Sequence, residues 1–312
     1  MKPENTAFVF PGQGSQKVGM LANAADAFDV VKPCFDEASQ ALGYDMWDLV
    51  QNGSQEELNL TETTQPVLLT ASVALWRAWC AEGGAKPAMM AGHSLGEFSA
   101  LVCAGALDFA DAVVLVRKRG AFMQTAVPVG EGAMAAIIGV DDAVIEEICS
   151  TSSAAGDGEV AAVNYNSPGQ LVIAGHAGAV ERAIVALKEA GAKRALPLPV
   201  SAPFHTQLMR PAGEQLAEEI SRLEIKTPEI PVVHNVHAQT ETDPARIGEL
   251  LVEQIYSPVR WTQCMQTMCS AGITHFVECG HGKVLSGLAR RVDRSLTVAA
   301  LEEPDSLRAA LG

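Results

Sequence analysis

Residues 87–106, PAMMAGHSLGEFSALVCAGA, carry the pattern that decides the fold. A short apolar run, Pro87–Ala91, leads directly into Gly92-His93-Ser94-Leu95-Gly96, and a longer apolar stretch follows over Leu95–Ala106. The short run predicts a buried strand, and the longer stretch predicts a buried helix. Glycines on both sides of such a turn allow the backbone to approach a neighbour closely. The pattern G-x-S-x-G at a strand-to-helix turn holds its serine in a strained, accessible conformation, which makes Ser94 a candidate nucleophile.

A nucleophilic serine needs two kinds of support from its surroundings. The start of the following helix supplies backbone N–H groups and a partial positive charge for a developing oxyanion. A base must take the hydroxyl proton. His205 is favoured, because its loop connects an expected strand to an expected helix and catalytic groups usually lie on such loops. Spacing alone leaves His234, His237 and His281 open, and a tight turn with an inert serine is the other alternative.

Outward from this turn, strand patterns alternate with helical patterns along the chain, which predicts an α/β fold. The middle of the chain shows the order β-α-β-β-α-β, the split βαβ or ferredoxin-like arrangement. We therefore expect a small ferredoxin-like domain at 127–200, inserted into a large α/β-hydrolase-like domain with a parallel sheet that comprises 1–126 and 201–312. The elements expected in the inserted domain are strands at Ala133–Val140, Val160–Asn164, Gln170–Ala174 and Lys193–Leu198, helices at Asp141–Ser150 and Ala177–Ala190, and a turn over 165–169.

The large domain has its own expected elements around the turn at Ser94. Thr6–Phe10 is a strand pattern that ends in the turn-rich loop Pro11–Gln16. Apolar residues recur at helical spacing over Gln65–Gly83, with glycine where a helix usually ends. The remaining expected elements are strands at Val232–Val236 and His275–Glu278 and helices at Ala110–Thr125, Leu208–Leu223, Asp243–Gln254, Thr262–Ala271 and Lys283–Val292.

Composition and charge argue against several classes of protein. The chain has 312 residues, of which 48% are hydrophobic and 19% charged, as in an ordinary globular protein. The net charge of −15 argues against nucleic-acid binding, which needs clustered Lys and Arg. No apolar run is long enough to span a membrane, and no signal-peptide pattern precedes the first strand, so we expect a cytoplasmic protein. The seven cysteines form no C-x-x-C pair, which argues against a disulfide framework, and we expect no metal site.

Five separated motifs agree in order and spacing with one protein family. They are Phe10-Pro11-Gly12-Gln13-Gly14-Ser15-Gln16, Gly92-His93-Ser94-Leu95-Gly96-Glu97, Arg119, Asn164-Tyr165-Asn166-Ser167-Pro168-Gly169-Gln170 and Ala202-Pro203-Phe204-His205. On these residues the chain resembles the bacterial malonyl-CoA:acyl carrier protein transacylases, the stand-alone form of the acyltransferase domains in fatty-acid and polyketide synthases. The resemblance extends from about Thr6 to Leu301.

The resemblance implies roles for the residues around the nucleophile. Ser94 matches the serine that becomes acylated in a ping-pong cycle, and His205 matches the base that takes and returns the proton. The backbone N–H groups of Leu95 and Gln13 match an oxyanion hole, although the loop at Gln13 could be a plain turn. Gln254 matches a neutral acceptor that orients the histidine, and its alternative is an ordinary residue at a helix end.

The resemblance also implies how the acyl group is chosen. Arg119 matches the group that binds the free carboxylate of malonyl, because a planar guanidinium can pair with a carboxylate bidentately. Helical spacing alone would place Arg119 on a solvated face. Phe204 matches a position where related domains with Phe take malonyl rather than methylmalonyl. Asn164 and Asn166 are candidate contacts to a pantetheine arm, although Asn in a turn more often hydrogen-bonds the backbone.

The family implies an acyltransferase that moves malonyl from coenzyme A to an acyl carrier protein in fatty-acid biosynthesis, as a monomer. No resident cofactor is expected, since coenzyme A is part of the substrate malonyl-CoA and the phosphopantetheine is carried by the partner. Both are anionic, so a basic patch must overcome the net charge, and its candidates are Lys188, Lys193 and Arg194, or Arg290 and Arg291. The alternatives are a serine esterase or thioesterase of α/β-hydrolase type and a trans-acting acyltransferase of a polyketide pathway. His281, where relatives often carry Pro, has no assigned role.

Overall fold

The computed structural model describes residues 2–200 and 202–312, so residue 201, where the second segment of the large domain is expected to start, lies outside it. The strands are β1 (Thr6–Phe10), β2 (Met89–Gly92), β3 (Gly132–Ile138), β4 (Val160–Ser167), β5 (Gln170–His176), β6 (Arg194–Pro197), β7 (Val232–Val233), β8 (His275–Glu278) and β9 (Thr297–Ala300). The α-helices are α1 (Ala22–Ala27), α2 (Val31–Leu42), α3 (Met46–Asn52), α4 (Gln55–Leu58), α5 (Thr61–Ala81), α6 (Leu95–Cys103), α7 (Phe109–Thr125), α8 (Asp142–Ala154), α9 (Ala177–Glu189), α10 (Arg210–Ile220), α11 (Pro244–Ile255), α12 (Trp261–Ser270), α13 (Val284–Val292) and α14 (Pro304–Leu311). Two short 3-10 helices, η1 (Pro3–Asn5) and η2 (Gln207–Met209), complete the set.

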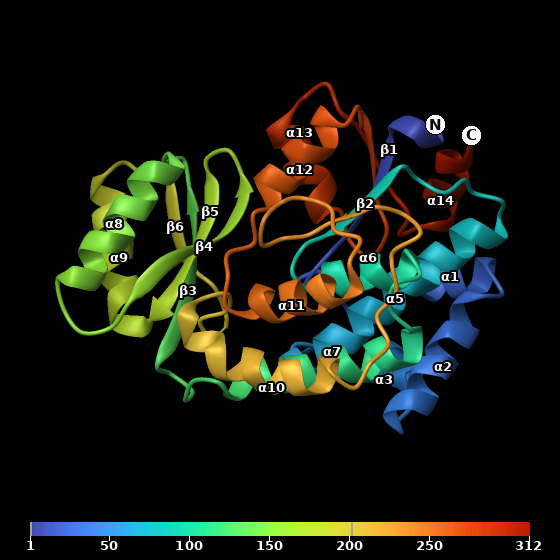
Figure 1. The fold of residues 1–312 in the computed structure, drawn as a ribbon, viewed down its shortest axis with the longest axis horizontal. Helices are drawn as coiled ribbons and strands as arrows, with labels where there is room; N and C mark the ends of the chain where they lie inside the picture. Colours follow the sequence, from blue (N-terminus) through green and yellow to red (C-terminus); the bar gives the residue numbers. More distant parts are fainter. Residues whose placement is uncertain (1, 201) are drawn as a thin grey trace.

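A five-stranded sheet with the order β7-β2-β1-β8-β9 forms the centre of the large part of the molecule (Figure 1). Every neighbouring pair in it is parallel, which confirms the parallel sheet predicted from the sequence. The register pairs Phe10, the last residue of β1, with Gly92, the last residue of β2. Since parallel strands end at the same edge, the loop after β1 and the turn at Ser94 lie next to each other.

The side chains of β1 alternate between two buried clusters, as the period of a strand requires. Phe8 and Phe10 lie in the cluster that includes α2, α5, α6 and α7, and Ala7 and Val9 lie in the cluster that includes α12 and α13. Helices therefore cover the sheet on both faces, and each strand residue is buried on one side or the other. The longest helix, α5, begins at Thr61, four residues before the predicted start, and its buried face packs against α2, α6 and α7.

The second sheet is a separate four-stranded antiparallel unit with the order β4-β5-β3-β6, covered by α8 and α9 (Figure 1). This is the predicted ferredoxin-like topology, and it has its own buried cluster. The prediction of a turn over residues 165–169 is wrong in length, because the turn is shorter. Strand β4 continues to Ser167 through two irregularities in its register with β5, so that Pro168 and Gly169 alone connect the strands. The limits 127 and 200 stay predictions.

Three other parts of the chain differ from the expectations. No element was expected before Gln65 other than β1, and the structure contains the four helices α1 to α4 there, of 6, 12, 7 and 4 residues. Strand β9 and helix α14 near the carboxyl end were also missed. The strand expected over Val232–Val236 ends at Val233, because His234 and Asn235 turn away and bond to α6. Among the described helices, none is long and apolar enough to cross a membrane.

Replacing Phe8 tests the packing between β1 and α5. The ring is fully buried and meets Trp76 and Trp79 edge-on, at centroid distances of 5.4 and 5.2 Å. We expect Phe8→Ala to lower the free energy of unfolding in urea by about 3–5 kcal/mol, because it leaves a cavity that two rigid indoles cannot fill. Val129→Ala, at a side chain that is 83% exposed, is the control and should change it by less than about 0.5 kcal/mol. Equal effects of the two would contradict this account of the core.

Candidate active site

Ser94 lies at the junction of β2 and α6 in a backbone conformation that a serine rarely adopts. Its φ is +51° and its ψ is −108°, which costs on the order of 1–3 kcal/mol unless the surroundings impose it. Two glycines allow the turn to be this tight. A Cβ at Gly92 would lie 1.8 Å from the carbonyl carbon of Gly96, and a Cβ at Gly96 would lie 2.0 Å from the carbonyl oxygen of Phe10. The predicted close approach of backbone at both glycines is therefore present.

His205 is the histidine that contacts Ser94. Its Nε2 lies 2.8 Å from Ser94 Oγ, and its Nδ1 lies 2.8 Å from the backbone oxygen of Gln254. Since a carbonyl can only accept, Nδ1 carries the proton and Nε2 presents its lone pair to the serine hydroxyl. Burial, together with the positive charge of Arg119, lowers the pKa of His205 to about 3. The imidazole is therefore neutral and able to accept a proton over the physiological range.

The structure also decides how Gln254 acts on the histidine. A neutral acceptor was expected, and it is the main-chain carbonyl of Gln254 rather than its side chain. The side-chain amide is used elsewhere: Oε1 accepts from Arg119, and Nε2 donates to Glu97 and to the backbone oxygen of Ser94. Among the described residues, no carboxylate bonds to either nitrogen of His205. One residue thus supports the base, the arginine and the nucleophile.

The other histidines that the sequence left open lie in different surroundings. His234 is fully buried and its Nδ1 lies 2.7 Å from Glu97 Oε1. His237 accepts a hydrogen bond from the backbone of Gln239. His281 lies 3.6 Å from Glu302 Oε1, in the loop after β8. None of the three forms a bond with Ser94, so the geometry selects His205.

Arg119 is buried at this site, and the solvated position that helical spacing suggested is wrong. Only 1% of its surface is exposed. Its Nη1 donates to Gln65 Oε1 at 2.7 Å, and its Nη2 donates to Gln254 Oε1 at 2.8 Å and to Ser94 Oγ at 3.2 Å. Its Nε has no hydrogen-bond partner among the described residues. Burial lowers the pKa of Arg119 to about 9, and the charge of Glu97 opposes this shift.

Three residues of this cluster were not assigned from the sequence, Gln65, Glu97 and Asn235, and His234 was left open there as a base rather than as a partner of Glu97. Gln65 had been placed in a helix without a role, and Glu97 had been quoted within a motif without a role. Glu97 is fully buried and accepts from Asn235 N at 2.9 Å and from Gln254 Nε2 at 2.8 Å, besides its contact with His234. No local spacing brings α5, α6 and the segment after β7 together, so no sequence signal pointed to these contacts.

The expected oxyanion donors lie where the loop after β1 meets the turn. Leu95 is the first residue of α6, and the first N–H groups of a helix have no partner within it. The loop that carries Gln13 packs against the turn, because a Cβ at Gly12 would lie 2.6 Å from the carbonyl oxygen of His93. Both residues are thus at the same edge of the sheet, as the expected oxyanion hole requires.

The remaining expected residues lie around the same edge. Phe204 is buried directly before His205. Asn166, on β4, accepts a hydrogen bond from His93 Nε2 at 2.8 Å, so it links the small sheet to the turn. Asn164 forms a bridge with Val259, and its Oδ1 is buried without a hydrogen-bond partner among the described residues.

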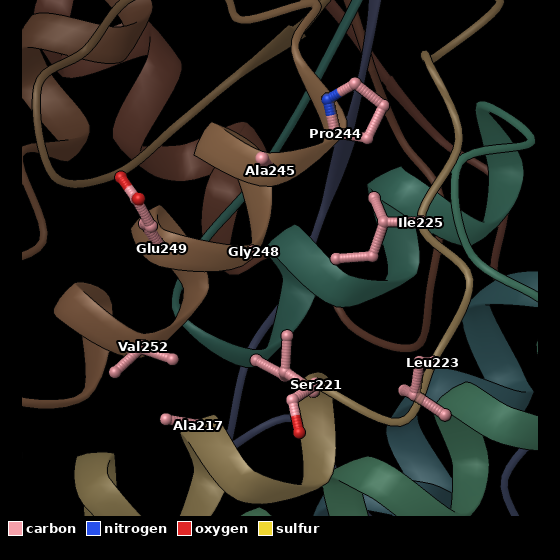
Figure 2. A pocket seen from close by; sticks show the side chains of 10 residues that line it. Ala217, Ser221, Leu223, Ile225, Pro244, Ala245, Gly248, Glu249 and Val252 are labelled. Carbon is pink, nitrogen blue, oxygen red and sulfur yellow. The ribbon is translucent and has the colours of Figure 1, made fainter.

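A surface hollow between α10 and α11 is separate from this cluster (Figure 2). It has a volume of about 420 Å³, and the side chains around it are mostly apolar. Its two polar side chains are engaged, since Ser221 donates to Glu218 O and Glu249 pairs with Arg246. The residues that line it are Ala217, Ile220, Ser221, Leu223, Ile225, Pro244, Ala245, Gly248, Glu249 and Val252. The hollow holds no nucleophile and base in contact, so we assign the chemistry to the cluster at Ser94.

Comparisons with known proteins agree with this arrangement. Residues 7–303 match the model of the acyl transferase domain family. The chain belongs to the acyl transferase family. A malonyl CoA-acyl carrier protein transacylase of Salmonella typhimurium is 58% identical over 306 residues, which cover 98% of each chain. The crystal structure of an acyl carrier protein S-malonyltransferase from Vibrio cholerae superposes with a TM-score of 0.96 at 55% identity and covers 98% of this chain and 99% of its own.

A third relative in the acyl transferase family was solved with its partner. The structure contains a type II PKS acyl-carrier protein in complex with its malonyl-transacylase. The matched chain has a TM-score of 0.96 and 52% identity to this chain. The match covers 98% of this chain and 99% of that one. The likeness therefore extends over both sheets, so that the large parallel sheet and the small antiparallel sheet are features of the family fold.

The low pKa of His205 predicts a flat pH profile for the reactivity of Ser94. A base with a pKa of about 3 stays neutral down to acidic pH. The rate constant for labelling by a fluorophosphonate, which reacts with activated serine hydroxyls, should change little between about pH 8 and about pH 5. An imidazole with the ordinary value near 6.5 would lose about thirtyfold over this range. His205→Ala provides the background rate, and a decline with a midpoint near the ordinary value would contradict the neutral buried base.

Proposed function

We propose that this chain transfers malonyl from coenzyme A to an acyl carrier protein through a malonyl ester on Ser94, as a step of fatty-acid biosynthesis. Relatives that match over nearly their whole length have this transfer in their names. The observation that carries the proposal is the position of Arg119, a buried guanidinium within hydrogen-bond distance of the nucleophile. A cation in this place suits an acyl group with a free carboxylate.

The first half-reaction uses the Ser94–His205 pair. His205 Nε2 accepts the hydroxyl proton while Oγ attacks the thioester carbonyl, and the N–H groups of Leu95 and Gln13 stabilise the oxyanion. When the tetrahedral intermediate collapses, the carbon–sulfur bond breaks and His205 returns the proton to the sulfur of coenzyme A. The Nδ1–H bond to the carbonyl of Gln254 keeps the imidazole in the tautomer that this step requires.

The second half-reaction runs the same steps with the other thiol. His205 accepts the proton of the phosphopantetheine thiol, whose sulfur attacks the ester carbonyl, and the oxygen of Ser94 leaves with the proton from His205. Because the donor and the acceptor both carry the acyl group on a pantetheine thiol, the same contacts can serve both, and Asn164 and Asn166 at the edge of the small sheet are the candidates for contacting this arm. No step needs a resident cofactor or metal, so none is part of the proposal.

Selection of malonyl follows from the burial of Arg119. The carboxylate of malonyl would pair with a guanidinium whose Nε has no partner among the described residues. An acetyl group would leave the cation buried and unpaired, which is costly in a site that excludes water. Phe204, buried next to His205, is the candidate for limiting space at the α-carbon, where methylmalonyl carries a methyl group.

Neither the geometry nor the comparisons favour the alternatives over this proposal. An esterase or thioesterase of α/β-hydrolase type is expected to place a carboxylate on the catalytic histidine, and here the backbone oxygen of Gln254 takes that place. A trans-acting acyltransferase of a polyketide pathway would use the same chemistry with another carrier. Carrier docking on the basic residues Lys188, Lys193, Arg194, Arg290 and Arg291, a monomeric state and a cytoplasmic location stay predictions.

Replacement of Ser94 tests the covalent intermediate. After incubation with malonyl-CoA, intact-mass spectrometry should show the native protein heavier by one malonyl group, and addition of holo-acyl carrier protein should discharge it. Ser94→Ala removes the oxygen that forms the ester, so no mass increase is expected. Persistence of the added mass in this variant would exclude Ser94 as the nucleophile.

Replacement of Arg119 tests the selection of malonyl. Arg119→Ala should lower single-turnover acylation by malonyl-CoA by at least about a hundredfold, because it removes a buried charge-assisted pair. Acylation by acetyl-CoA should stay the same or increase. Arg117→Ala is the matched control, because Arg117 lies two residues earlier on α7 and stacks on Tyr44 rather than contacting Ser94. Equal losses with both acyl groups would refute the carboxylate-binding role.

A further inference from the structure

The side chain of Asn235 bonds the backbone of the turn at two points, Gly92 O and Ser94 N, which lie directly before the strained residue Ser94. Its Oδ1 accepts from Ser94 N at 2.7 Å, and its Nδ2 donates to Gly92 O at 2.7 Å. Strand β7 pairs with β2 through Val232 and Val233 and then ends. The amide of Asn235 therefore supplies the next donor and acceptor along β2, at the point where backbone pairing has stopped.

Asn235 is in turn held by the carboxylate of Glu97. Glu97 Oε2 accepts from Asn235 N at 2.9 Å, and Glu97 Oε1 lies 2.7 Å from His234 Nδ1. All three residues are fully buried. Taking a carboxylate out of water is costly even when donors satisfy it, and a buried charge is weak evidence for stability. The contact with Asn235 leads to the turn, because Asn235 bonds Ser94 N and Gly92 O.

The same carboxylate oxygen reaches Ser94 by a second route. Gln254 Nε2 donates to Glu97 Oε2 at 2.8 Å and to Ser94 O at 3.1 Å. One amide therefore holds the N–H of Ser94 and another holds its carbonyl oxygen, and a single carboxylate connects the two. We use the term serine clamp for Glu97, Asn235 and Gln254 together.

We propose that Asn235 and Glu97 are positioning residues for acyl transfer, which act by fixing the peptide of Ser94 in the orientation that its reaction requires. The clamp aims Oγ at His205 and occupies the N–H of Ser94, so that the N–H of Leu95 faces the reacting carbonyl. This inference rests on the proposed acylation of Ser94. A small rotation of the peptide would misalign the nucleophile and the oxyanion donor together. Such a misplacement lowers the rate by about a hundredfold.

Asn235→Ala removes both bonds to the turn. In single-turnover experiments, we expect the saturating rate constant for acylation by malonyl-CoA to fall about ten- to a hundredfold. The half-saturating concentration should change less than about threefold, because Arg119 and the pantetheine contacts are retained. Labelling by a fluorophosphonate should fall in parallel. Thr267→Val is the matched control, since it removes a 2.7 Å bond to Ala238 in the same loop without touching the turn, and it should keep the native rate constants.

Asn235→Asp keeps the volume of the side chain and adds a readout that a purely structural role would not produce. The ionised carboxylate has no donor for Gly92 O, whereas the protonated acid does, and burial raises the pKa of such a carboxyl. We expect this variant to react faster at about pH 5 than at about pH 7.5. The rate of the native protein should change little between these two pH values. The charged and titratable groups around the position are Glu97, Arg119, His93, His205, His234, His237, Arg260 and Cys264.

The outcomes separate this inference from the proposed function. Native rates in Asn235→Ala, an equal loss in Thr267→Val, or a flat pH profile in Asn235→Asp would each overturn the positioning role. If the native protein were labelled by the fluorophosphonate but not acylated by malonyl-CoA, the proposed function would fail. The labelling rates of the variants would then still decide the role of Asn235.

Discussion

Ser94 has a φ of +51°, and groups that lie far apart in the chain hold it there. The side chain of Asn235 accepts from its N–H, and the side chain of Gln254 donates to its carbonyl. Glu97 accepts from the backbone N–H of Asn235 and from the side-chain amide of Gln254. Gly96 allows the turn to press against the end of β1. The rest of the site depends on this peptide, because the direction of Oγ and the direction of the N–H of Leu95 follow from it.

The two buried charges of the site are separated by one amide. Arg119 and Glu97 both bond to the side chain of Gln254, and the carbonyl of the same residue bonds to His205. A carboxylate placed directly on the histidine would favour the imidazolium, whereas here burial and the neighbouring guanidinium favour the neutral base, and the carbonyl of Gln254 opposes them only in part. The site therefore combines a permanent cation for the acyl carboxylate with a histidine that stays free to accept a proton.

Local patterns account for the parts that were predicted correctly. The turn at Ser94, the parallel sheet and the order of elements in the small sheet follow from hydrophobic periods and glycine positions over a few residues each. The patterns failed where helices have only 4 to 7 residues, as in α1, α3 and α4, and where a strand is ended by side-chain bonds, as at Val233. They also missed α2, which has 12 residues. Arg119 shows the limit most clearly, since its neighbours on α7 indicated solvent and the packing of α5 and α11 buried it.

The sequence by itself determined that a serine stands at a strand-to-helix turn with glycines on both sides, because that pattern is local and steric. Through family motifs it also indicated His205, Arg119 and Gln254, but not how they meet. Only the tertiary structure decided that the carbonyl of Gln254 orients the base and that Glu97 and Asn235 hold the nucleophile. Their bonds connect α6 to segments about 140 residues away, as in the 138-residue separation between Glu97 and Asn235. Such contacts arise from the register of the parallel strands, which no local period records.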